Sequence, residues 1–155
     1  MAPSPLSAAR AALVALAGDW AGTEHLGASP WTSAGTAHGV HSLRASIRDQ
    51  VLVHDYEQRR DGAVTLTGHG VLAVDPESTE VLWWWFDDYG HPPLAPSRGS
   101  FADDGSLVLV KATPRGRQRA SFAASGDALV HRIEVAPSGE EALTTILEAS
   151  YARRR

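Results

Sequence analysis

Histidine is the side chain in this sequence best suited to chemistry near neutral pH, and seven histidines occur in 155 residues. Imidazole can ligate a metal or heme iron, accept a proton or orient a ligand. His38 and His41 are three residues apart, which on a strand directs them to opposite faces and disfavours one metal bound by both. His131 is expected to point inward from a late strand. It is the candidate axial ligand for heme, or else an interior histidine that hydrogen-bonds to Tyr, Glu or water.

Two further inward positions carry polar groups. His54 and Tyr56 alternate with the acidic residues Asp55 and Glu57, so the pair is expected to face inward and to hold one polar group of a ligand. Glu24 is also expected inside, and a buried carboxylate needs a partner such as Arg or His. With an inward histidine it would form a ligand-orienting or proton-transfer pair, while the competing interpretation is a salt bridge near the mouth of the interior.

Other candidate groups are better explained by local structure. Asp87 and Asp88 resemble paired carboxylates, but adjacent strand residues point apart and the segment "DDYG" is typical of a turn. His69 lies between Gly68 and Gly70, which allows a ligand or a neighbouring backbone to approach closely and is also typical of a bend or bulge. The sequence contains no Gly-x-Ser-x-Gly elbow, phosphate loop or dinucleotide fingerprint.

The elements that position these residues are predicted to be one helix and about ten strands. Residues 7–17 are predicted to form the helix, with Ser7 as N-cap and Gly18 ending it. After it, turn signals such as Asp61–Gly62 and Asp104–Gly105 separate runs of alternating residues. The predicted strands are 19–26, 35–44, 50–59, 64–74, 80–87, 97–102, 106–112, 117–123, 128–136 and 142–152.

These strands predict an all-β domain over residues 1–155, an antiparallel up-and-down β-barrel that closes its own edges, with a β-sandwich as the alternative. A barrel of this size would hold a lumen with aliphatic, aromatic and a few hydrogen-bonding side chains, as a small-ligand pocket requires. The residues expected to line it are Trp20, Glu24, His54, Tyr56, Trp84, Phe122, His131 and Tyr151.

Three consecutive tryptophans occupy positions 83 to 85. With Asp87 placed outside, Trp84 would face inward and Trp83 and Trp85 outward. Two bare indoles form a sizeable apolar patch, so we expect them to be covered by the N-terminal helix, by a loop or by a second subunit in a homodimer.

Composition excludes several classes of protein. The net charge of -4 argues against nucleic-acid binding, and the absence of cysteine excludes disulfides and Cys-based metal sites. No stretch approaches the roughly 20 apolar residues of a membrane span. The run "AALVALAG" at 11–18 lacks a preceding positive region, so we predict a structural helix there rather than a secretory signal, and a cytoplasmic protein.

Several segments resemble small bacterial barrels of the calycin type. They are "LAGDWAGTEHLGASPW" at 16–31, with a Gly-x-Trp-x-Gly opening, "RDQVLVHDYEQ" at 48–58, "GHGVLAVDPESTEVLWWWFDDYG" at 68–90 and "TILEASYARR" at 145–154. In their order they resemble an uncharacterised bacterial lipocalin-like family with a short W-x-D-x-x-G element, here Trp85, Asp87 and Gly90. The resemblance implies a barrel whose opening tryptophan plugs one end.

The opening is also similar to that of nitrobindin, a heme-binding barrel, and the strand count is similar to that of intracellular fatty-acid-binding proteins. The sequence departs from nitrobindin at Glu24, where that family has glycine, and at Ser29–Pro30, where it has Tyr-Pro. It also lacks the two-helix lid of the fatty-acid-binding proteins.

The function we predict is binding of a small apolar or amphipathic molecule in the lumen, without a cofactor and without catalysis. The first alternative is a nitrobindin-like heme protein with His131 as axial ligand. The second alternative is an isomerase or cyclase that uses Glu24 and an interior histidine.

Overall fold

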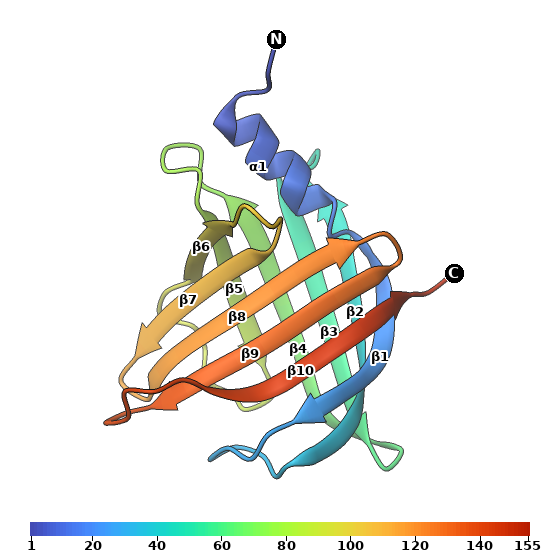
Figure 1. Cartoon of the computed structure of the whole chain (residues 1–155), viewed down its shortest axis with the longest axis vertical. Coiled ribbons are helices and arrows are strands. Elements are labelled where there is room, and N and C mark those ends of the chain that lie inside the picture. Colours follow the sequence, from blue (N-terminus) through green and yellow to red (C-terminus); the bar gives the residue numbers. More distant parts are fainter.

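The computed structural model describes residues 1–155 and contains one helix followed by ten strands (Figure 1). The elements are α1 (Pro5–Val14), β1 (Gly18–Leu26), β2 (Gly35–Ser46), β3 (Val51–Arg60), β4 (Ala63–Val74), β5 (Val81–Asp87), β6 (Ser97–Phe101), β7 (Leu107–Thr113), β8 (Gly116–Ser125), β9 (Ala128–Pro137) and β10 (Thr144–Arg153). The predicted helix and strands are therefore all present, with ends that shift by a few residues.

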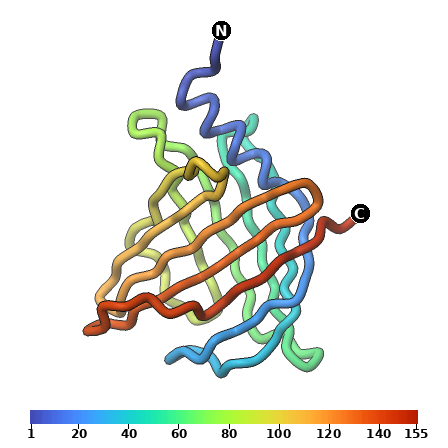
Figure 2. The backbone as a smooth tube through the Cα atoms, in the orientation of Figure 1, coloured from blue at the N-terminus to red at the C-terminus, as the bar shows by residue number.

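The ten strands form a closed antiparallel barrel in which each strand pairs with its neighbours in sequence. The closing pair is β1 with β10, where Trp20 lies opposite Arg153 and Glu24 opposite Ala149. Figure 2 shows the chain winding once around the barrel, so that the first and last strands lie side by side. Closure leaves no strand at the edge of the sheet. The predicted up-and-down barrel is confirmed, and the sandwich alternative is wrong.

The helix begins two residues and ends three residues earlier than the predicted 7–17. Ser4, not Ser7, is the N-cap and accepts a hydrogen bond from the backbone N–H of Ser7. Pro5 follows it in the first turn, where proline's missing N–H costs nothing. This helix, the one helix of the structure, is not long and apolar enough to cross a membrane.

One end of the barrel is closed beneath α1 (Figure 1). Trp20 is fully buried there, and its indole Nε1–H donates to the carbonyl oxygen of Leu16 at 3.1 Å. The guanidinium of Arg153 lies 4.2 Å from the centre of the Trp20 ring and donates to the carbonyl of Ala17. Leu13, on the helix, belongs to the same apolar core. The end-plugging role implied for the opening tryptophan agrees with this packing.

The orientation predicted for β5 is wrong. Trp83 is 4% exposed and faces the interior, whereas Trp84 is 40% exposed on the outer wall. Trp85 shares the inward face with Trp83, so these two indoles do not form the outer patch for which the helix, a loop or a second subunit was the expected cover. The error came from placing Asp87 outside. Asp87 is the last residue of the strand, where an inward carboxylate still reaches solvent and accepts a hydrogen bond from Trp85 Nε1 at 3.2 Å.

Gly68 and Gly70 explain how the barrel accommodates two inward indoles. Both glycines face inward on β4, and Gly70 lies directly opposite Trp85. A methyl group at Gly68 would overlap the Trp85 ring, and one at Gly70 would contact both Trp83 and Trp85. The "GHG" segment is therefore neither a bend nor a bulge, because its glycines make room for rings on the next strand.

Candidate functional site

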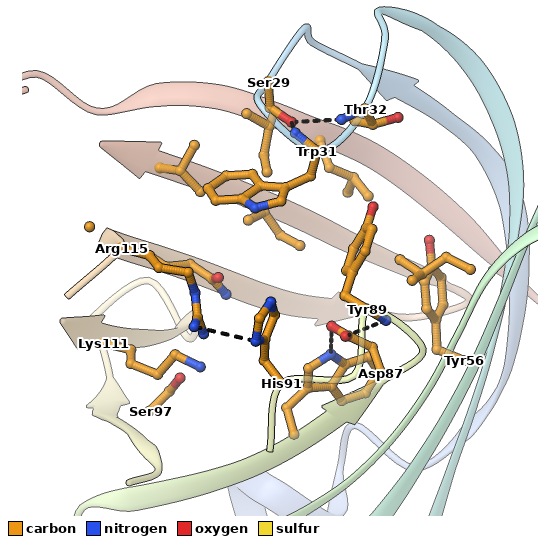
Figure 3. A pocket seen from close by; sticks show the side chains of 18 of the residues that line it. Ser29, Trp31, Thr32, Tyr56, Asp87, Tyr89, His91, Ser97, Lys111 and Arg115 are labelled. Atoms are coloured by element: carbon orange, nitrogen blue, oxygen red, sulfur yellow. Dashed lines mark hydrogen bonds between the residues drawn. The ribbon is translucent and has the colours of Figure 1, made fainter. Parts of the chain in front are cut away.

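The barrel contains a cavity of about 240 Å³ that opens at the end opposite α1. It is bordered by the loops that follow β1, β5 and β7, from which Trp31, Tyr89 and Arg115 project, as Figure 3 shows. This volume is slightly below the roughly 300–1,000 Å³ of pockets that hold drug-sized ligands. The cavity therefore suits a small molecule.

Three histidines from three strands meet in the middle of the barrel. His41 lies on β2, His54 on β3 and His131 on β9, and all three line the cavity. The centre of the His41 ring is 5.0 Å from that of His54 and 5.7 Å from that of His131. We call these residues the histidine cluster.

The histidine cluster is uncharged at neutral pH. Burial lowers the pKa of His54 to about 3, with a further contribution from the nearby His131. Burial also lowers the pKa of His131 to about 4 and that of His41 well below its usual value. A charged imidazole loses its hydration when it is buried, so the neutral form is favoured.

The hydrogen bonds of the cluster restrict its tautomers. His131 Nδ1 is 2.9 Å from the carbonyl oxygen of Ser121. Because a carbonyl only accepts, Nδ1 carries the proton and Nε2 keeps the lone pair. His41 Nδ1 and His54 Nε2 are 2.8 Å apart and share one proton, whereas His41 Nε2 and His54 Nδ1 have no protein partner. Whichever ring donates the shared proton, one of the two unpartnered nitrogens carries a free N–H and the other a free lone pair.

Aromatic rings enclose the histidine cluster. The Trp83 and Trp85 ring centres are 5.1 Å apart, and Trp85 lies 4.9 Å from His54. Phe122 stacks on His131 at 4.1 Å with an interplanar angle of 15°. Around the histidine cluster the interior is therefore flat, polarisable and uncharged, which favours an apolar or aromatic ligand body.

Glu24 lies behind this wall and has no exposed surface. Its carboxylate accepts hydrogen bonds from Tyr151 Oη at 2.5 Å, from Tyr56 Oη at 2.8 Å and from Gln58 Nε2 at 3.0 Å. All its partners are neutral, contrary to the expected arginine or histidine. Gly39 on β2 provides the space, because a methyl group there would overlap the carboxylate.

The two tyrosines of this network remain protonated donors. Burial and the adjacent Glu24 carboxylate both raise the pKa of Tyr56 and of Tyr151. Their hydroxyl groups thus stabilise a carboxylate without any counter-charge. Because Tyr56 also lines the cavity, the network supports one part of its wall from behind.

Charged groups gather at the open end of the cavity. Lys111, Arg115 and Arg117 line it there, and Asp87 is the single acidic residue of the lining. Figure 3 shows Lys111 and Arg115 on the same side of the opening, with the Arg115 guanidinium 3.5 Å from His91 Nδ1. The cavity is therefore positively charged at its mouth, although the protein as a whole is acidic.

The structure divides the eight residues predicted to line the lumen into three groups. Those that line the cavity are His54, Tyr56 and His131. Those that are buried inward without lining it are Trp20, Glu24, Phe122 and Tyr151. Trp84 faces outward, so its predicted inward position is wrong.

Sequence reasoning missed His41, Trp83, Trp85 and Lys111. Alternation could have found two of them, since His41 shares a face with Leu43, and Lys111 shares one with Leu107 and Leu109. For the tryptophans the useful signal was the pair of inward glycines on the preceding strand. The structure contains no group of three or more His, Cys, Asp or Glu side chains arranged to hold a metal ion.

Comparison with known proteins identifies the family. The model of a family described as "Protein of unknown function (DUF1579)" matches residues 6–151. The chain belongs to this family. The barrel of this DUF1579 protein is similar to the solved structure of the S-type phycobiliprotein lyase CPES from Guillardia theta, with a TM-score of 0.64, 11% sequence identity and 99% of each chain covered. No curated protein matches the sequence significantly.

The structural similarity extends over the whole barrel, and at 11% identity it concerns the fold alone. The resemblance to lipocalin-like barrels is thus confirmed at the level of the fold.

Proposed function

We propose that this DUF1579 protein binds a small amphipathic molecule in the lumen of its barrel. The observation that carries the proposal is the cavity itself: a volume of about 240 Å³ inside the barrel, with aromatic side chains, an uncharged histidine cluster and one open end. Pockets for small ligands combine an apolar lining with a few placed polar groups. Here, the lone pair of His131 Nε2 is a polar group that no protein atom uses.

The direct test is native mass spectrometry, with an absorbance scan, on protein purified from its own host without denaturation. A bound mass of a small amphipathic molecule that is released on unfolding supports the proposal. Protein that carries no small molecule, and whose tryptophan emission responds to no amphipathic probe, contradicts it.

A pair of variants locates the binding. Gln118 faces inward on β8 beside Lys111 and lines the cavity, so Gln118→Trp should fill it. Ala112 lies on the outer face of β7 at nearly the same level, so Ala112→Trp adds the same ring outside the barrel. Binding should fall at least tenfold in Gln118→Trp and change less than twofold in Ala112→Trp. Equal binding by both variants would place the ligand outside the lumen.

The heme alternative has weaker support. His131 lines the cavity with a free Nε2 lone pair, as an axial ligand requires. The cavity volume of about 240 Å³, however, is below the roughly 300–1,000 Å³ of pockets for drug-sized ligands, and heme is larger than most such ligands. A Soret band after heme addition that is absent in His131→Ala would favour heme over the proposal.

The isomerase or cyclase alternative also has weaker support. Glu24 makes no contact with the cavity, and its oxygen atoms already accept hydrogen bonds from Tyr56, Gln58 and Tyr151. A proton-transfer role would require the carboxylate to reach a ligand directly or through a water. Turnover of a candidate substrate that is lost in folded Glu24→Gln would favour this alternative.

A further inference from the structure

Lys111 is the single lysine of the sequence; the other thirteen of its fourteen Lys and Arg residues are arginines. It lies on β7, where it continues the inward face formed by Leu107 and Leu109. It is half-buried, lines the cavity, and forms no hydrogen bond or ion pair with the protein. The ammonium group is therefore a cation inside the barrel mouth without a protein counter-ion.

The surroundings of Lys111 do not neutralise it. Burial lowers its pKa, and the neighbouring Arg115 lowers it further, by more than Asp87 raises it. Asp87 already accepts hydrogen bonds from Trp85 Nε1 and from the backbone N–H of Tyr89. A partly desolvated cation beside a second cation is costly unless an anion approaches both.

The remainder of the cavity carries no charge. Leu107 on β7 and His131 on β9 both pair with Phe122 on β8, so His131 of the histidine cluster lies at the level of Leu107. Lys111 is four residues further along the strand, a distance of about 13 Å at the usual rise per residue. A ligand that spans this distance meets positive charge at one end and an aromatic, uncharged environment at the other.

We propose that the lumen selects monocarboxylates, with the carboxylate bound by Lys111 at the mouth and the apolar body directed toward Trp83, Trp85 and the histidine cluster. This inference rests on the proposed lumenal binding and specifies the chemical class of its ligand. Lys111 provides the charge, and Arg115 reinforces it.

The first test compares three probes with the same chain length and different head groups: octanoate, octan-1-ol and octylamine. Their binding is measured by isothermal titration calorimetry and by the tryptophan emission of the protein, to which Trp83 and Trp85 in the cavity lining contribute. Octanoate should bind at least tenfold more tightly than octan-1-ol, and octylamine more weakly than either. Equal binding of octanoate and octan-1-ol, or preference for octylamine, would overturn the proposal.

Variants assign the preference to one residue. Lys111→Met should reduce the octanoate preference over octan-1-ol to less than twofold, with octan-1-ol affinity unchanged, and Lys111→Arg should retain it. Arg119→Gln is the matched control, because it removes one positive charge from the outer face of the neighbouring strand. An equal loss of preference in Arg119→Gln would mean that overall charge, not Lys111, is responsible.

A second test uses the unmodified protein and does not depend on a variant folding. Lys111 carries the only ε-amino group, so an acylating reagent labels this residue and the N-terminal amino group. Octanoate should slow labelling of Lys111 several-fold and leave the N-terminal rate unchanged, as read by peptide mass spectrometry. Unprotected Lys111 at saturating octanoate would overturn the proposal.

The two proposals fail in different ways. If octan-1-ol binds in the lumen as well as octanoate, and Gln118→Trp blocks both, lumenal binding stands and the carboxylate class is wrong. If none of the three probes binds and no small molecule accompanies the native protein, both proposals are wrong.

Discussion

Replacement of Tyr151 by phenylalanine should destabilise the protein, because its hydroxyl donates to the fully buried carboxylate of Glu24. A hydrogen bond to a charged group contributes about 1.5–3 kcal/mol. We therefore expect Tyr151→Phe to lower the free energy of unfolding by about 2 kcal/mol. At roughly 2–4 °C per kcal/mol for a chain of this length, the Tm should fall by about 4–8 °C.

Tyr56→Phe should have an effect of similar size, since its hydroxyl lies 2.8 Å from Glu24 Oε1. The double variant leaves only Gln58 to donate to the carboxylate. Because the two hydroxyl groups share one acceptor, the combined loss should differ from the sum by more than about 0.5 kcal/mol. Such coupling distinguishes a shared network from two unrelated packing defects.

The assay is urea unfolding followed by tryptophan emission, to which the buried Trp20 and Trp83 contribute. Tyr89→Phe is the matched control, because Tyr89 is the third tyrosine, is 48% exposed, and its hydroxyl group has no protein partner. If Tyr56→Phe and Tyr151→Phe unfold within about 0.5 kcal/mol of Tyr89→Phe, the hydrogen bonds to Glu24 contribute no net stability and the reasoning is refuted.

Three further predictions concern the interior. Burial lowers the pKa of His54 to about 3, so near pH 6.5 this histidine binds a proton in the unfolded chain but not in the folded protein. The free energy of unfolding should therefore be constant above about pH 7.5. Between about pH 6.5 and 5 it should fall by up to ~1.4 kcal/mol per pH unit for each histidine of the cluster. Urea titrations across this range check it, and a flat profile would contradict a neutral cluster. Gly68→Ala should lower the free energy of unfolding by about 1–3 kcal/mol, because the new methyl group overlaps Trp85; an unchanged urea midpoint would mean that the ring is not packed there. Trp83→Ala should lower it by about 3–5 kcal/mol and Trp84→Ala by less than about 1 kcal/mol, and the reverse order in urea unfolding would indicate that β5 is turned the other way.

The elements of this fold could be predicted because their signals are local. Alternation of apolar and polar residues, interrupted by turn residues, predicted all ten strands and placed Glu24, His54, Tyr56 and His131 on inward faces. Each of these inferences needs only the few neighbouring residues that fix which side of a strand is apolar. Closure of the barrel followed from the number of strands and the cost of unpaired edges.

Only the tertiary structure decided what the interior contains. Alternation groups Trp83 with Trp85 and opposes them to Trp84, but it does not say which group faces inward. That choice depends on Gly68 and Gly70, whose missing side chains leave room for the two indoles on the adjacent strand. The preference is therefore a property of the strand pair and not of β5 alone.

The site is also built from residues that are far apart in the sequence. His41, His54 and His131 come from strands separated by up to 90 positions in the chain, and the partners of Glu24 are Tyr56, Gln58 and Tyr151. Strand alternation predicted that Glu24, His54, Tyr56, His131 and Tyr151 point inward. How the barrel closes decides the rest, because register and strand tilt set which inward side chains meet. It sets the distances between these side chains, the neutral state of the histidines and the position of Lys111 at the open end.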